Sequence, residues 1–295
     1  MTESVHTEML PTRVVGGEPR TLGSPREVLS PTRQTVKRFL RHRVAVVGLI
    51  VVTLIVLIAV FAPLITRYGP DTIDLRTRKQ GPTADHWFGT DRTGRDTFAR
   101  VVYAGRVSLA VGAVAVVISV VVGAALGALA GYFGGPVDAI IIILTVAALV
   151  GPGVLNTMLI LGLLNWPLPC RLVRAKLLAV RGQEFVTAAR ALGARPSRIL
   201  LMHAFPNAVD VLVVYASLGI ATAILLEAGL SFLGLGVQQP TPSWGNMLNV
   251  ARNVSVLEQY PWQWLPAGIA IVITVLAVNF VGDGLRDALD PRMKL

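Results

Sequence analysis

Five long apolar runs constrain this chain more than any other feature of its sequence. In chain order they are Val44–Ile65, Val107–Phe133, Ala139–Cys170, Val211–Val237 and Leu265–Gly282. A run of about 20 apolar residues crosses the hydrocarbon core of a bilayer as a helix. Only 15% of the residues are charged, against about 25% in soluble domains. The sequence therefore predicts an all-α, polytopic membrane protein.

The run Ala139–Cys170 decides how many crossings we expect. It is shorter than the roughly 40 residues that two full crossings need. A single crossing would export residues 171–208, which hold seven Lys/Arg against one Glu, contrary to the positive-inside bias. We therefore expect a hairpin that turns near Gly151-Pro152-Gly153 and about six membrane helices. Its outgoing arm, 137–150, spans only about 21 Å, so it either crosses a thinned bilayer or does not fully cross.

The charged residues beside the apolar runs predict the orientation of the chain in the membrane and its division into three segments. Residues 1–35 have no apolar periodicity and are expected to form a disordered cytoplasmic tail. Residues 36–100 would hold the first membrane helix and an extracytoplasmic segment, and 101–295 the core transmembrane domain. We expect both termini on the cytoplasmic side of the plasma (inner) membrane. The net charge is +10. Because most of the Lys and Arg residues lie beside apolar runs, they are more consistent with a signal that sets membrane topology than with nucleic-acid binding.

Two features inside the apolar runs suggest helix packing. Gly123, Gly127 and Gly131 recur every four residues, and such a bare face lets another membrane helix approach closely. Glu227 is the only charge in its run. It follows Asp210 by roughly 25 Å of helix, which places it near the outer interface. There a structural hydrogen bond is favoured over contact with a substrate.

The most informative polar stretch is Glu184–Asn207, within the cytoplasmic loop 181–208. Ala188, Ala189 and Gly193 give its first half a face of small residues. Gly193 is expected to end one short helix, and Pro196 is well placed to begin another. A short helix with small side chains suits insertion into a groove on a partner. On pattern alone, an ordinary solvated loop is the alternative.

The sequence offers no chemistry of its own for driving a reaction. It contains no phosphate-binding GxxxxGK[ST] string and no HExxH or GxSxG motif, so we expect no catalytic residues and no ATPase activity. Asp283, Asp287 and Asp290 lie among arginines, which favours a solvated helix end over a metal site. The single cysteine, Cys170, excludes an internal disulfide. An ion-coupled secondary carrier remains the alternative, although carriers usually place ionisable groups at the membrane midplane.

Several strings in this chain resemble those of one family. The spacing from Ala188-Ala189 through Gly193 to Pro206 is similar to the EAA loop of ABC importer permeases, with Thr187 at the motif's Glu position, His203 at its Ile position and Phe205 at its Leu position. FGTDRTGRD (88–96), LEAGLSFLGLGVQQPTPSWGNML (226–248) and GDGLRDALDPR (282–292) resemble the C-type permease subunit of dipeptide and oligopeptide (peptide/nickel) importers.

The resemblance implies a type I ABC importer permease fold and a set of partners. These would be a second homologous permease, two ATP-binding subunits that hold the ATP and Mg, and an extracytoplasmic peptide-binding protein. This chain would bind no cofactor. Nickel complexes or other small solutes are the alternative cargo. The implied ATPase-coupling residues are Thr187, Ala188, Ala189, Gly193, His203, Pro206 and Asn207. The implied binding-protein contacts are Asp91, Gly94, Arg95, Asp96 and Trp244.

Overall fold

A computed structural model describes residues 31–133 and 153–289. In these ranges the chain forms helices and loops, and its one strand-like feature is an isolated bridge between Thr90 and Asp96. The longer helices are α1 (Pro31–Arg41), α2 (Arg43–Val60), α4 (Thr97–Phe133), α6 (Val154–Asn165), α7 (Pro167–Arg181), α8 (Glu184–Ala191), α10 (Val209–Leu233) and α13 (Leu265–Leu289). The shorter ones are α3 (Ala62–Ile65), η1 (Leu75–Thr77), α9 (Pro196–Arg198), η2 (Ile199–Ala204), η3 (Phe205–Ala208), α11 (Trp244–Leu248), η4 (Asn249–Arg252), α12 (Val254–Gln259) and η5 (Pro261–Gln263).

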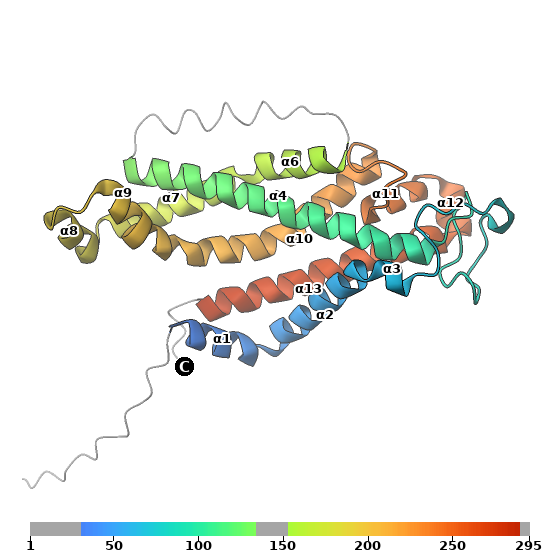
Figure 1. Cartoon of the computed structure of the whole chain (residues 1–295), viewed down its shortest axis with the longest axis horizontal. Coiled ribbons are helices and arrows are strands. Elements are labelled where there is room, and N and C mark those ends of the chain that lie inside the picture. The colour runs from blue at the N-terminus through green and yellow to red at the C-terminus, as the bar shows by residue number, and fades with distance from the viewer. Residues whose placement is uncertain (1–30, 134–152, 290–295) are drawn as a thin grey trace, which may run out of the picture.

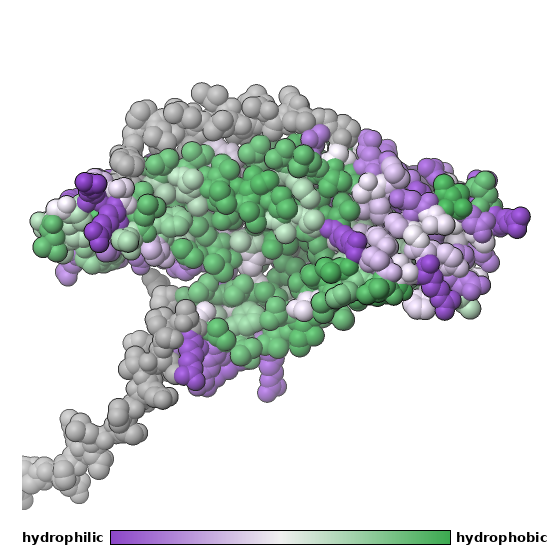
Figure 2. Space-filling view, viewed as in Figure 1, coloured by the Kyte–Doolittle hydropathy of each residue, from purple (hydrophilic) through white to green (hydrophobic). Residues whose placement is uncertain are grey.

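Within the described residues, four stretches are long and apolar enough to cross a membrane. They are Arg43–Val60, Thr97–Gly131, Pro196–Leu233 and Leu265–Leu289. Helices suit such runs because every backbone polar group finds its partner inside the segment. The long helices share one general direction (Figure 1), and apolar side chains cover the middle of the visible face between two more polar ends (Figure 2). The prediction of an all-α polytopic membrane protein is confirmed.

Helices α6 and α7 occupy the place of the predicted return arm of the hairpin. They follow one another with only Trp166 between them. The two helices run parallel to α4, because Gly162 lies against Ile118 and Gly131 lies against Arg174. Helix α4 ends near α9, whereas α6 begins beside α11, on the side of helices α11 and α12 (Figure 1). The predicted outgoing arm falls outside the described residues.

The three regularly spaced glycines of α4, Gly123, Gly127 and Gly131, lie directly against the backbone of Trp166 and α7. A Cβ at Gly123 would lie 2.7 Å from the Trp166 carbonyl oxygen, and one at Gly127 would lie 2.5 Å from that of Cys170. At Gly131 the nearest atom would be Arg174 Cα, 3.1 Å away. Any side chain larger than hydrogen would therefore push the two helices apart.

The N-terminal and C-terminal helices form a second packed group. Helix α2 lies against α13 where Gly48 contacts the backbone of Ala277, and His42 lies 3.5 Å from Asp287 in an ion-pair geometry. Helix α1 begins at Pro31, so residues 31–35 are helical rather than part of a tail. The rest of the predicted tail, 1–30, lies outside the described residues.

The polar ends of the molecule differ in construction. Helices α8 and α9 project at one end, toward which the end of α13 also points (Figure 1). Helices α11 and α12 and the segment between α3 and α4 gather at the opposite end, here called the outer cap (residues 66–96 and 234–264). At its base Arg106 donates hydrogen bonds to the carbonyl oxygens of Ala59 and Val60, 2.6 Å each, and so caps α2.

Candidate functional site

The projecting helix α8 is closed by a well-defined C-terminal turn. The Ala194 amide donates to the Ala189 carbonyl at 3.1 Å, and the Gly193 amide donates to that of Arg190 at 3.0 Å. This pair of bonds is a Schellman motif, which requires a left-handed residue after the helix. Gly193 supplies it with φ of +77°. The glycine therefore ends α8, as the sequence predicted.

A small apolar core fixes α8 to the membrane helices. Val186 is the one fully buried residue of α8, and it belongs to a cluster with Val180 of α7, Ile199 of η2 and Leu212 of α10. Pro196 starts α9, and the chain then continues through η2 and η3 into α10 without a gap. We call residues 182–208 the projecting unit. A displacement of α8 would pass to α7 and α10 through this core.

The predicted coupling residues lie on the surface of the projecting unit. Thr187, Ala188, Gly193, His203, Pro206 and Asn207 are exposed, and Ala189 is half-buried. Apolar side chains are exposed beside them, because Leu192 is 88% exposed and Phe185 is 43% exposed. Leu201 and Met202 of η2 are exposed as well. The unit thus presents small and apolar groups to whatever lies beyond this end.

A groove runs into the helices that flank the projecting unit. Its volume is about 540 Å³, and α4, α6, α7, α10 and the end of α13 line it. Most of its lining is apolar, while Ser119, Asn165, Tyr215 and Thr222 place neutral polar groups in its wall. Asp210 and Arg286 lie at its charged end. Such a surface can hold an uncharged chain segment without the cost of desolvating fixed charges.

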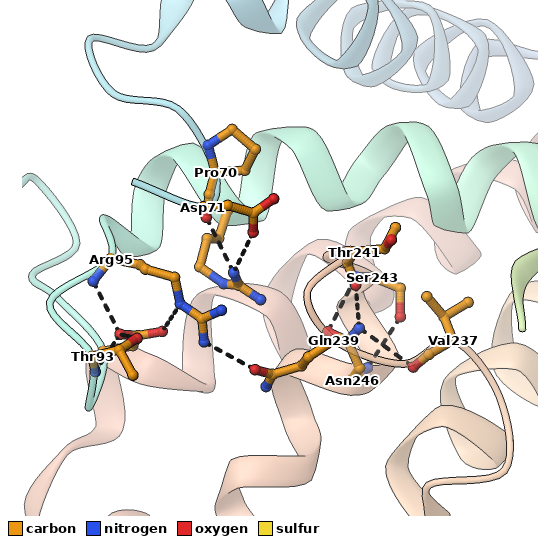
Figure 3. Close-up of polar contacts among 11 residues, drawn as sticks. Pro70, Asp71, Thr93, Arg95, Val237, Gln239, Thr241, Ser243 and Asn246 are labelled. Atoms are coloured by element: carbon orange, nitrogen blue, oxygen red, sulfur yellow. Dashed lines mark hydrogen bonds and ion pairs between the residues drawn. The ribbon is translucent and has the colours of Figure 1, made fainter. Parts of the chain in front are cut away.

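The FGTDRTGRD segment is built into the interior of the outer cap. Asp91 accepts hydrogen bonds from the amide and hydroxyl of Thr93 and from the amide of Arg95, while Arg95 Nε lies 2.7 Å from the second carboxylate oxygen (Figure 3). Burial alone would raise the pKa of Asp91, but these hydrogen bonds and the Arg95 charge together hold it below its ordinary value. Gly94, with φ of +81°, lies against the backbone of Asp74, where a Cβ would have no room.

The same segment joins the two parts of the outer cap, residues 66–96 and 234–264. Arg95 Nη2 donates to Gln239 Oε1 at 3.1 Å (Figure 3). Asp96 caps α4 by accepting the Ala99 amide at 2.6 Å, and its other oxygen lies 2.8 Å from His86 Nδ1. Through these bonds the segment, here called the FGTDRTGRD clasp (residues 88–96), holds together parts of the chain that are distant in sequence.

Trp244 and Glu227 belong to one buried network at the base of the outer cap. Ser108 donates to Glu227 Oε2 at 3.1 Å, and Ser231 donates to Oε1 at 2.7 Å. The Trp244 amide in turn donates to the Ser108 hydroxyl at 3.1 Å. Glu227 is fully buried and Trp244 is 2% exposed. The carboxylate therefore joins α10 to α4 directly and, through Ser108, to α11.

The five residues predicted to contact a binding protein are therefore internal or largely so. Asp91, Gly94, Arg95, Asp96 and Trp244 hold the outer cap together, and any contact with a partner stays a prediction. Sequence reasoning also missed several residues that join α10 to α4, α6 and α7. Lys176 lies 3.0 Å from Asp210, and the Tyr215 hydroxyl contacts both Ser119 and Asn165. The only available signal was the pair Pro167 and Pro169, which marks a helix break.

The fold defines a multi-pass, all-α membrane protein with the projecting unit at one end. Residues 132–295 match the family described as binding-protein-dependent transport system inner membrane component. Residues 30–82 match the N-terminal TM domain of oligopeptide transport permease C. The chain belongs to this family of transport-system membrane components, which confirms the resemblance seen in its sequence.

Similar proteins cover nearly the whole chain. A Brucella suis protein named as a peptide permease is 47% identical over 279 residues, which are 90% of this chain and 92% of the relative. The dipeptide transport system permease protein of Alkalihalophilus pseudofirmus is 42% identical over 280 residues, 90% and 91% of the two chains. The oligopeptide transport system permease protein of Bacillus subtilis is 37% identical over 281 residues, again 90% and 91%.

Proposed function

We propose that this chain is the membrane-spanning permease subunit of an ATP-driven ABC importer for dipeptides or oligopeptides. It would form half of the translocation path and carry no ATPase site of its own. Family membership and three relatives named for peptide transport support the class and the cargo. Nickel complexes and other small solutes are the less favoured cargo, because none of these three names refers to them.

The projecting unit is the observation that carries this proposal. Its tip exposes Leu192 and Phe185. Burying an apolar side chain of this kind in a contact with a partner would stabilise that contact by about 1.5–3 kcal/mol. Small residues beside them, Ala188 and Ala189, permit close approach of a partner's backbone. An ATPase subunit with an apolar groove would bury these groups. The Val186 anchor would then pass the movement of that subunit to α7 and α10.

Charge supports placing the projecting unit in the cytoplasm. Arg181, Arg190, Arg195 and Arg198 lie in or beside it, and Lys/Arg-rich loops are retained on the inner side. Helix α1, which is basic, and the end of α13 lie toward the same end (Figure 1). We therefore place both termini in the cytoplasm and the outer cap on the extracytoplasmic face.

The remaining partners follow from this arrangement. A second permease would cover the groove lined by α4, α6, α7, α10 and the end of α13, which would close the path that one chain leaves open. An extracytoplasmic peptide-binding protein would dock on the outer cap. Exposed side chains such as Trp87 and Arg92 would meet it directly, while the buried FGTDRTGRD clasp would hold them in place.

Copurification and uptake test the proposal together. In mild detergent the tagged chain should retain its ATPase subunits, and proteoliposomes should take up peptide only when ATP is present. Leu192→Glu should abolish ATPase retention by placing a charge in an apolar contact. Val254→Glu, at an apolar position of the outer cap that is 65% exposed, is the control and should retain them. A chain that imports peptide alone on an ion gradient would instead be a secondary carrier.

A further inference from the structure

The two prolines at the break between α6 and α7, Pro167 and Pro169, remove the helical donors of two backbone carbonyls, those of Leu163 and Asn165. In a regular helix the carbonyl oxygen of Asn165 would accept the amide of residue 169. That residue is Pro169, which has no N–H to donate. An unpaired carbonyl inside a membrane protein costs free energy comparable to a lost hydrogen bond. The break therefore requires a donor from another part of the chain.

Tyr215 of α10 supplies that donor. Its hydroxyl donates to the Asn165 carbonyl oxygen at 3.2 Å and lies 3.0 Å from the hydroxyl of Ser119 on α4. Three helices therefore meet at a single phenol oxygen. All three residues also line the 540 Å³ groove, so a shift of this oxygen would change the shape of the groove wall.

A second joint lies closer to the projecting unit. Lys176 of α7 and Asp210 of α10 form an ion pair at 3.0 Å. Between the two joints, Val173 and Leu177 of α7 and Leu212 of α10 belong to one buried apolar cluster. The helices on either side of the projecting unit are thus connected both at its base and farther along, at the proline break.

We propose that Tyr215 is the positioning residue that carries movement of the projecting unit to the wall of the groove. Contacts between apolar side chains are non-directional, whereas a hydrogen bond fixes distance and direction. The Tyr215 hydroxyl holds α10 in register with Asn165 and Ser119, so the three segments shift as one body. This inference rests on the proposed function, since it needs an ATPase that moves the projecting unit.

The test measures peptide imported per ATP hydrolysed by the complete importer in proteoliposomes. Tyr215→Phe keeps the ring and removes only the hydroxyl. Losing a hydrogen bond of ordinary strength changes a conformational equilibrium about fivefold, and the transport ratio should fall by about that factor. Thr222→Val is the matched control. It removes a hydroxyl from the same groove, but one that bonds only within α10, to Leu218, and the ratio should not change.

A double variant distinguishes a positioning role of Tyr215 from a role limited to donating a hydrogen bond to the Asn165 carbonyl. Pro169→Ala restores an N–H to the Asn165 carbonyl, so a purely structural role for Tyr215 would become dispensable. We expect Pro169→Ala/Tyr215→Phe to transport as poorly per ATP as Tyr215→Phe alone. A normal ratio in Tyr215→Phe, or rescue of the ratio by Pro169→Ala, would overturn the inference. Retention of the ATPases by Leu192→Glu would instead contradict the proposed coupling surface, so the two failures are distinguishable.

Discussion

Replacing Gly127 by alanine should weaken the packing of α4 against α7. The added Cβ would lie 2.5 Å from the Cys170 carbonyl oxygen. Reaching even 3.0 Å, the shortest approach that real Cβ atoms make, requires the helices to separate by 3.0 − 2.5 = 0.5 Å at this point. Overpacking of this kind costs about 1–3 kcal/mol. Gly123 and Gly131 lie along the same contact, so the separation cannot stay local.

Thermal unfolding of the purified importer in detergent measures this effect. At about 2–4 °C per kcal/mol, Gly127→Ala should lower the Tm by roughly 2–12 °C. Gly229→Ala is the matched control, because a Cβ there meets nothing within 4 Å and alanine is the better helix former. It should unfold at or slightly above the wild-type temperature. Equal Tm values for the two variants would refute the close approach of α4 and α7.

Two further predictions concern the outer cap. Glu227→Gln turns one acceptor of the Ser108 and Ser231 hydroxyls into a donor, at a cost of about 1–3 kcal/mol, so the yield of assembled importer should fall while competition between peptides stays unchanged. Altered selectivity at normal yield would make Glu227 a transport residue instead. Because the folded-state pKa of Asp91 is lowered, its contribution to stability is complete above the unfolded carboxyl pKa of about 3.9 and is lost as the pH falls through the lower folded value. In the wild type, the amides of residues 88–96 should therefore lose protection from hydrogen exchange only in strong acid. In Asp91→Asn they should be less protected already at neutral pH. Equal protection of the two proteins at neutral pH would disprove the stabilising role of Asp91.

The features that could be predicted from the sequence are those whose pattern lies within a single stretch of the chain. Apolar runs reveal membrane helices because the signal lies within each segment. Gly193 marked the end of α8 because a left-handed turn selects glycine. The glycines of α4 indicated a contact face through their spacing, although the spacing did not identify α7 as the neighbour.

The interior of the outer cap could not be predicted in the same way. The family resemblance implied that FGTDRTGRD contacts a binding protein, and charged residues usually lie at the surface. Arg95 of this segment instead pairs with Gln239, 144 residues away, and such a pairing leaves no pattern in either segment. Tyr215 was missed for a similar reason. The prolines indicate a helix break, but only the packing of α10 shows which side chain reaches the free carbonyl.

Cross-linking at the tip of the projecting unit tests the central claim most directly. The only cysteine of the chain, Cys170, is buried, so Leu192→Cys adds a single accessible thiol at the most exposed apolar position of the unit. In inside-out membrane vesicles containing the whole importer, we expect a short thiol cross-linker to join residue 192 to an ATPase subunit, and Val254→Cys to give no such product. Labelling of residue 192 by an impermeant reagent from outside intact cells, with no cross-link to an ATPase, would contradict the account.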